Sequence, residues 1–206
     1  MLMKRLNKIT YVHYIILFLT LFFLLFNSSF VLAGEDDIRR RVAFKLFRAT
    51  LAADIQIDKK IYNGKLHIGL LYSGNTSIDR LRAKSFLQQF QTNNKLSDIH
   101  NNPVQIILLS EADLMNPSIS KELFSTLAGI YLLDDLTEEV IQSITKLTIE
   151  KQIISYSPFK GNVESGILGG LSVEAKVRPF INMKTLKESG VLLKPFFLKV
   201  IKRYEP

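Results

Sequence analysis

KLHIGLLYSGNTSIDR, residues 65–80, is the stretch that decides the fold class. Its first half, 65–72, has the length and near-continuous hydrophobicity of a strand that is buried on both faces. A short polar turn at 73–76 leads into residues 77–91, where apolar side chains recur at helical spacing. A buried strand followed directly by an amphipathic helix is the repeating unit of a parallel α/β sheet.

The same unit recurs along the chain. We expect a helix over 35–54 before the first strand, because apolar residues recur there at helical spacing. Three more apolar runs of strand length follow, with amphipathic segments between them. The strands are VQIILL at 104–109, AGIYLL at 128–133 and QIISY at 152–156, and the helices lie at 118–126 and 137–150.

After Pro158 the pattern changes. Residues 166–175 and 176–181 are typical of a β-hairpin, and Pro179 is expected to place its second strand at a sheet edge. The remaining elements are a short helix at 182–188 that Gly190 closes and a final helix at 195–204. We therefore predict a three-layer α/β domain: a mostly parallel sheet of about four strands with helices on both faces, plus a C-terminal β-hairpin and a final helix.

The N-terminus carries the pattern of a secretory signal. A short basic segment without acidic residues precedes an uncharged apolar run at 14–26, and small residues follow. We place cleavage between Ala33 and Gly34, so that residues 1–33 are a signal peptide and 34–206 form a single periplasmic domain. The alternative is an uncleaved N-terminal anchor, although this apolar run is shorter than the roughly 20 residues that a bilayer needs.

Composition narrows the function classes. Residues 34–206 keep 24 basic residues against 19 acidic ones, a net charge of +5 that suits an acidic partner or anionic headgroups. The lysines are scattered and do not interleave with aromatic residues, so nucleic acid is not an expected partner. The chain has no cysteine, which excludes thiolate nucleophiles, CxxC redox pairs and cysteine zinc sites.

The sequence contains no catalytic constellation, and we expect no catalytic residue, cofactor or metal ion. His13, His67 and His100 lack the spacing of a metal site. Ser118 opens a formal SxxK match, the spacing of serine acylases, but the motifs that accompany it in those enzymes are absent. We interpret Ser118 as a helix cap.

The pair Asp134–Asp135 has two interpretations. Two neighbouring carboxylates could chelate an ion, or they could cap the helix that follows. We favour capping, because Asp135 with Glu138 fits a capping box.

The carboxyl edge of the predicted sheet is the expected binding rim. Ligands and partners of open parallel sheets bind beyond the carboxyl ends of the strands. The small polar side chains there suit hydrogen bonding to a ligand rather than its transformation, although such loops are polar in every protein of this class. The rim residues are Ser73, Gly74, Asn75, Ser110, Glu111, Asp134, Asp135 and Ser157.

The order of these segments, and above all the closing stretch SGILGGLSVEAKVRPFINMKTLKESGVLLKPFFLKVIKRY (165–204), resembles the YfiR family of periplasmic proteins, which includes HmsC-type regulators. The tryptophan that usually follows the first helix in that family is absent, and so are the cysteines that some members use for redox-sensitive disulfides, which argues against redox sensing. The positions that carry the resemblance are Gly166, Arg178, Ile181, Asn182, Gly190 and Leu198.

This resemblance implies a regulator that is not an enzyme. YfiR-type proteins hold a membrane-bound diguanylate cyclase inactive through its periplasmic portion, which keeps cyclic-di-GMP output and biofilm formation low. The implied partner is such a cyclase or a sensor kinase, and a homodimer is left open. An exposed apolar patch is then expected among Phe180, Phe196 and Phe197, of which at least two are expected in the core. The alternative is a periplasmic small-molecule receptor, similar to the substrate-binding protein of a transporter or sensor.

Overall fold

The computed structural model describes residues 34–91 and 97–206. The expected signal peptide and the residue before its cleavage site lie outside these ranges. The chain divides into two compact units, residues 1–41 and 42–206. The described part of the first unit, 34–41, is helical, and residues 42–53 of the second unit are also helical; the expected helical range was 35–54. No helix within the described ranges is long and apolar enough to span a bilayer.

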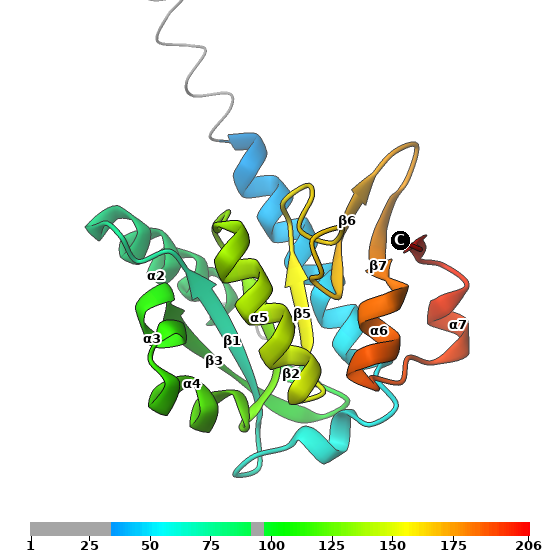
Figure 1. Ribbon diagram of the computed structural model, residues 1–206, viewed down its shortest axis with the longest axis horizontal. Coiled ribbons are helices and arrows are strands. Elements are labelled where there is room, and N and C mark those ends of the chain that lie inside the picture. The colour runs from blue at the N-terminus through cyan, green and yellow to red at the C-terminus, as the bar shows by residue number, and fades with distance from the viewer. Residues whose placement is uncertain (1–33, 92–96) are drawn as a thin grey trace, which may run out of the picture. The chain divides into compact units, whose positions relative to one another are not determined.

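One mixed sheet forms the centre of the second unit (Figure 1). Five neighbouring strands, β3, β1, β4, β5 and β6, are parallel; the first four are the expected parallel strands, whereas the β6 segment was expected in a separate hairpin. Across the sheet the strand order is β2-β3-β1-β4-β5-β6-β7-β8. The strand bounds are β1 (Leu66–Tyr72), β2 (Asp98–Ile99), β3 (Asn102–Ser110), β4 (Leu127–Leu132), β5 (Ile154–Ser157), β6 (Gly169–Val173), β7 (Val177–Asn182) and β8 (Lys202–Tyr204).

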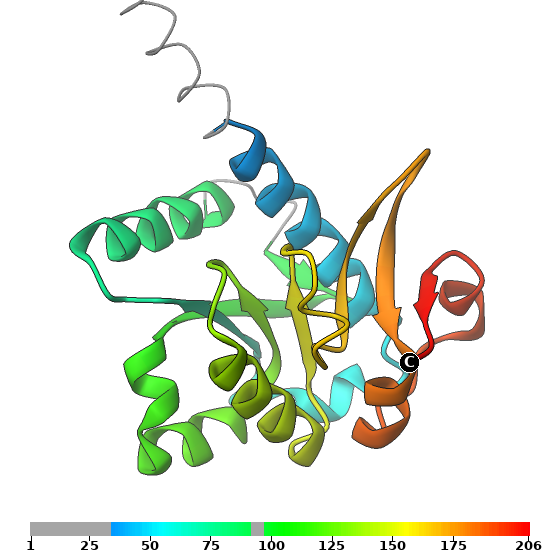
Figure 2. The same cartoon turned by 45° about the horizontal axis from the view of Figure 1, so that its top comes forward.

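The sheet is larger than the predicted four strands, because its described part has eight. The hairpin of β6 and β7 does not stand apart from the parallel strands. β6 pairs with β5 through Tyr156–Gly169 and Ser157–Gly170, so the hairpin extends the same sheet. Figure 2 shows the tip of this hairpin projecting beyond the neighbouring strands. β2 and β8 are short edge strands.

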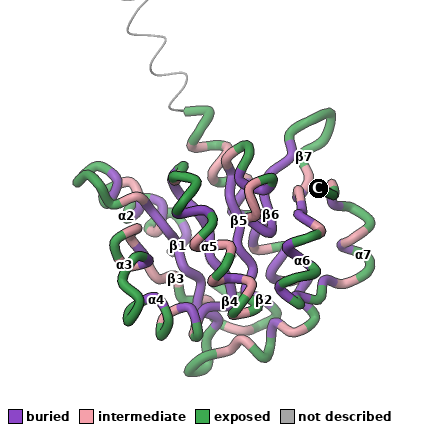
Figure 3. Tube along the Cα trace, in the orientation of Figure 1, coloured by how far each residue is buried: buried purple, intermediate pink, exposed green. Residues whose placement is uncertain are grey.

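Helices cover both faces of the sheet, which confirms the three-layer prediction. The segment 42–53 and α2 pack on one face, whereas α3, α4 and α5 pack on the other. The helices are α2 (Ser77–Gln91), α3 (Glu111–Met115), α4 (Pro117–Phe124), α5 (Glu138–Glu150), α6 (Met183–Ser189) and α7 (Pro195–Leu198), with a 3-10 turn η1 (Ile57–Lys60). Figure 3 shows that β1, β4 and β5 are buried between these layers.

An aromatic cluster joins the 42–53 helix to the sheet. The Phe44 ring lies 5.1 Å from Tyr131 of β4 at 85°, an edge-to-face contact. Close packing explains Gly129: a Cβ there would lie 2.9 Å from Leu51 Cδ2 and 3.0 Å from Phe47 Cζ. The helix can therefore approach β4 this closely only where the strand carries no side chain.

The C-terminal elements differ from the prediction of one helix over 195–204. α7 ends at Leu198, and residues 202–204 become β8, which pairs with Phe180 to Asn182 of β7. β7 is therefore not an edge strand. Pro179 pairs with Leu171 of β6, but β8 does not extend as far as this residue, so the proline lies where that side of β7 is locally open.

The predicted helix caps were right in one case and wrong in two. Gly190 ends α6 with φ 66°, the left-handed conformation expected of a C-terminal glycine. Ser118 is not a cap, because α4 begins with Pro117 and its N-cap is Asn116. Asp135 is not a cap either, since the N-cap of α5 is Thr137. In both cases the helix starts at a neighbouring residue that also favours a cap or a first turn.

Candidate functional site

The parallel strand order reverses between β1 and β4. From β1 the chain passes through α2 to β3 on one side, and β4 then returns to the other side of β1. The two loops that leave such neighbouring strands diverge, and a crevice at their carboxyl ends is the usual ligand position in open α/β sheets. The loops concerned here are residues 73–76 after β1 and 133–137 after β4.

The buried carboxylate of Asp134 links these two loops. Its Oδ2 accepts hydrogen bonds from the Ser73 backbone N–H at 3.0 Å and from the Ser73 hydroxyl at 3.2 Å. Its Oδ1 pairs with the guanidinium of Arg82, which reaches over from α2. Asp134 is 5% exposed, so its charge is held in place by bonds from both sides.

Arg82 is positioned by its own helix. Its second nitrogen pairs with Asp79 at 3.2 Å, one helical turn earlier. Asp79 in turn accepts from the Thr76 N–H at 2.9 Å, while the Thr76 hydroxyl accepts from the Asp79 N–H at 3.2 Å. This reciprocal capping box starts α2. Hydrogen bonding from Thr76, together with the charge of Arg82, lowers the pKa of Asp79.

Four of the predicted rim residues come together at this edge. Ser73 bonds to Asp134, and Gly74, at φ 73°, lies so close to Ser110 that a Cβ on the glycine would be 2.9 Å from the serine Cβ. Ser110 is the N-cap of α3, in a capping box with Asp113. The rim thus joins the loops after β1, β3 and β4.

The other four predicted rim residues differ in accessibility. Asn75 and Asp135 are exposed, and Glu111 is half-buried as the first residue of α3. Ser157 is fully buried, and its hydroxyl oxygen accepts from the Phe159 N–H at 3.1 Å and the Asn162 amide at 2.9 Å. Ser157 is therefore a structural residue and not a rim donor, because the loop after β5 folds back over it.

Sequence reasoning missed Thr76, Asp79 and Arg82. The signal was present, because Thr76 and Asp79 have capping-box spacing, and Asp79 and Arg82 form an i,i+3 charge pair. The tertiary partner Asp134, 52 residues away from Arg82, was not readable from this pattern. The Ser73 hydroxyl donates to Asp134, whose other oxygen is held by Arg82, and the described residues form no cluster of three or more metal-ligating side chains.

Two of the three histidines lie in the described ranges, and neither belongs to this rim. His67 is buried in β1 with its ring 5.5 Å from that of Tyr62, and burial lowers its pKa. His100 lies 3.4 Å from the Lys194 ammonium. His13 falls outside the described residues.

The C-terminal positions that carried the family resemblance have structural contacts. Gly166 has φ 121°, and a Cβ there would lie 2.9 Å from Thr145. Asn182 caps α6 and donates to the Val163 carbonyl at 2.7 Å. Ile181 is buried, Leu198 packs partly against the core, and Arg178 pairs with Glu174 at 3.2 Å.

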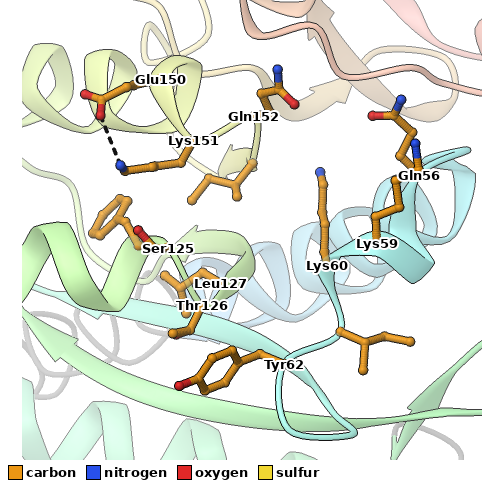
Figure 4. A pocket seen from close by; sticks show the side chains of 13 residues that line it. Gln56, Lys59, Lys60, Tyr62, Ser125, Thr126, Leu127, Glu150, Lys151 and Gln152 are labelled. Atoms are coloured by element: carbon orange, nitrogen blue, oxygen red, sulfur yellow. Dashed lines mark ion pairs between the residues drawn. The ribbon is translucent and has the colours of Figure 1, made fainter.

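A pocket of about 510 Å³ opens at the opposite, amino-terminal edge of the sheet. Figure 4 shows Lys59 and Lys60 of η1 on one wall, and Glu150, Lys151 and Gln152 from the end of α5 on another. The turn after α4 supplies Ser125 and Thr126, and Tyr62, Leu127 and Ile153 add apolar surface.

Lys60 is the most buried ammonium of this pocket. Its Nζ lies 2.7 Å from Asp54, and the two side chains are 12% and 0% exposed. Burial lowers the pKa of Lys60, and the neighbouring Asp54 opposes that shift. The pair anchors η1 to the end of the 42–53 helix, and none of its members was singled out from the sequence.

The sequence matches no protein-family model and no curated protein. Solved structures share the fold. A conserved domain protein from Vibrio cholerae has a TM-score of 0.50 at 13% identity, with 75% of this chain and 60% of that chain covered. The ligand-free, open structure of a substrate-binding protein with adhesive properties from Clostridium difficile has a TM-score of 0.50 at 14% identity, covering 73% and 57%.

An ABC domain from Streptococcus pneumoniae in complex with L-Trp has a TM-score of 0.48 at 15% identity, with 75% and 60% covered. The chain therefore spans about 60% of the length of the solved structures it resembles. What these comparisons establish is the α/β fold with its mostly parallel sheet, which the chain shares with a substrate-binding protein.

Proposed function

We propose that this chain is an exported binding domain that holds a small polar molecule at the carboxyl edge of β1 and β4. The observation that carries the proposal is the Ser73–Asp134–Arg82 network at the point where the strand order reverses. The network fixes two diverging loops in one geometry before a ligand arrives, which lowers the entropy that binding costs. The exposed Asn75 and Asp135 then lie in loops that are already ordered.

The chemistry of the rim favours binding over catalysis. The charges of Asp134, Arg82 and Asp79 are paired with one another, and the exposed side chains of the two loops include the Asn75 amide and the Asp135 carboxylate. The shared fold with a substrate-binding protein supports the same class of function. The match covers 57% of the length of that protein, so the proposed ligand site is placed on the described domain alone.

A thermal-shift screen of neutral polar metabolites tests this proposal. A ligand at 100 times its dissociation constant should stabilise the protein by about 2.7 kcal/mol. Asn75→Ala should remove that shift without changing the melting temperature of the free protein, because Asn75 is exposed. Glu188→Ala, on the exposed side of α6, is the matched control. A ligand shift that survives in Asn75→Ala would contradict the proposed position.

A second candidate is YfiR-type repression of a membrane-bound diguanylate cyclase, which exposed apolar side chains support. Phe196 is 65% exposed on α7, as one of the three predicted phenylalanines. Phe197 is 6% exposed. Phe180 is half-buried, with the Lys202 Nζ 5.0 Å from the centre of its ring. One of the three rings therefore lies in the core, whereas at least two were expected there. Val173 and Val177 at the hairpin tip add further exposed apolar surface.

An affinity capture from membranes of the native host tests this second candidate. Under this hypothesis the wild-type protein recovers a cyclase or sensor kinase with a periplasmic portion, and Phe196→Asp loses it while its unfolding free energy stays the same. Glu188→Ala is again the control. Equal recovery by Phe196→Asp would remove Phe196 from the interface.

A further inference from the structure

The pocket at the amino-terminal edge has an excess of positive charge. Three lysines and one glutamate line it, and Asp54 lies behind Lys60. Lys151 pairs with Glu150 at 3.0 Å, but the glutamate side chain is 58% exposed, so water screens this pair and it holds the lysine weakly. Within the described ranges the Lys59 side chain has no carboxylate partner within ion-pair distance. Even with Asp54 included, one positive charge is left over.

This excess is not needed to neutralise the helix ends nearby. α4 and α5 both finish at the pocket, and carbonyl groups at a helix C-terminus attract cations. Here backbone and hydroxyl donors satisfy those carbonyls locally. Ser125 Oγ donates to the Lys121 carbonyl and Thr126 Oγ1 to the Leu123 carbonyl, each at 2.8 Å. The last turn of α5 is closed in the same way by the N–H groups of residues 151–153.

Gln152 provides an independent observation. It follows the C-cap of α5 with φ 55°, at the position where helices usually place glycine because a side chain is strained there. The Gln152 side chain, which a glycine at this position would lack, lines the pocket. Neither the side-chain amide of Gln152 nor that of Gln56 hydrogen-bonds to another described residue, so both side chains are available to a ligand in the pocket.

We infer that this pocket binds a small organic anion through a phosphate or carboxylate group. Lys59 and Lys151 lie on opposite walls of the pocket (Figure 4) and together make it attractive to an anion, and the Gln152 side-chain amide donates a hydrogen bond. Tyr62, Leu127 and Ile153 cover the organic part. A volume of about 510 Å³ lies within the range of roughly 300–1,000 Å³ that small-molecule sites occupy, and it exceeds the size of an inorganic ion.

This site is separate from the one proposed above. The two lie at opposite ends of the parallel strands, and they share no residue. Neutral polar ligands are expected at the carboxyl edge, whereas the amino-edge pocket requires an anion. The failure of one proposal therefore leaves the other standing.

Isothermal titration of the full-length protein with glycerol 3-phosphate and with citrate tests the inference and separates the two anion chemistries. Uncharged glycerol and inorganic phosphate are the reference probes. We expect one of the organic anions to bind at low salt more tightly than inorganic phosphate, and glycerol not to bind. Lys59→Met should weaken that binding about tenfold, the factor that one charge-assisted hydrogen bond supplies.

Gln152→Gly distinguishes a ligand contact from a structural role. Glycine suits the positive φ, so the melting temperature should stay equal or rise, while affinity for the anion should fall. Lys84→Met, an exposed lysine of α2 that does not line the pocket, controls for the overall positive charge of the protein. Equal weakening by Lys84→Met, unchanged affinity in Gln152→Gly, or no binding of either organic anion would each overturn the inference.

Discussion

Replacing Asp134 by alanine should destabilise the protein strongly, although the residue lies in a loop. The carboxylate accepts two hydrogen bonds from Ser73 and pairs with Arg82, and its side chain is 7% exposed. A hydrogen bond to a buried charged group contributes about 1.5–3 kcal/mol. The Arg82 side chain is 38% exposed and still pairs with Asp79 when Asp134 is replaced, so its pair with Asp134 contributes only about 1 kcal/mol.

The lower limits for the two bonds and the ion pair come to about 4 kcal/mol, and half-buried Ser73 regains some hydration in the variant, so we expect Asp134→Ala to lower the free energy of unfolding by about 3 kcal/mol. For a domain of this size that corresponds to a fall in melting temperature of about 6–12 °C. Urea titration followed by circular dichroism measures the free energy, and calorimetry measures the melting temperature.

The neighbouring residue is a matched control. Asp135 has the same chemistry but is exposed, and it does not cap α5, so Asp135→Ala should change stability by less than about 0.5 kcal/mol. If the two alanine variants lose the same small amount of stability, the argument that Asp134 joins the two loops is refuted.

Two further predictions concern the core and its response to pH. Gly129→Ala should destabilise the protein by about 1–3 kcal/mol or more, because the new Cβ would lie 2.9 Å from both Leu51 and the Ile154 carbonyl. Gly34→Ala is the control and should be neutral, because no atom lies within 4 Å of its new Cβ. Denaturant titrations measure both changes. The Tyr156 hydroxyl donates to the Gly170 carbonyl, and burial raises its pKa. Because the unfolded chain then ionises first as pH rises, the stabilisation from this hydroxyl is complete below pH 10 and is lost as pH rises above that value. The difference in unfolding free energy between wild type and Tyr156→Phe should therefore shrink in alkaline buffer, and a difference that is constant across pH 8–11 would contradict it.

The central α/β units were predictable because local pattern and tertiary environment agree there. The runs at 65–72, 104–109 and 128–133 are apolar enough to be buried on both faces, and β1, β3 and β4 occupy nearly those bounds. Helices α2 and α5 follow from periodicity in the same way. The number of strands was underestimated, because a hairpin pattern does not reveal whether it joins an existing sheet.

The C-terminal region shows where local signals fail. Residues 202–204 carry helix-compatible residues, yet they form β8 because the open side of β7 at Phe180 to Asn182 offers backbone partners. The misplaced caps have a similar cause, since several neighbouring residues can each cap a helix and the packing of the helix selects among them.

The sequence by itself determined the alternation of strands and helices, the absence of thiol chemistry and the polar character of the carboxyl-edge loops. These properties depend on residue types and short-range periodicity, which are read without knowing which segments meet. Only the tertiary structure decided that Asp134 joins Ser73 to Arg82, that Ser157 is buried, and that η1 and the end of α5 enclose a lysine-lined pocket. Each of these facts depends on contacts between residues far apart in the chain, and strand order and helix packing set those contacts.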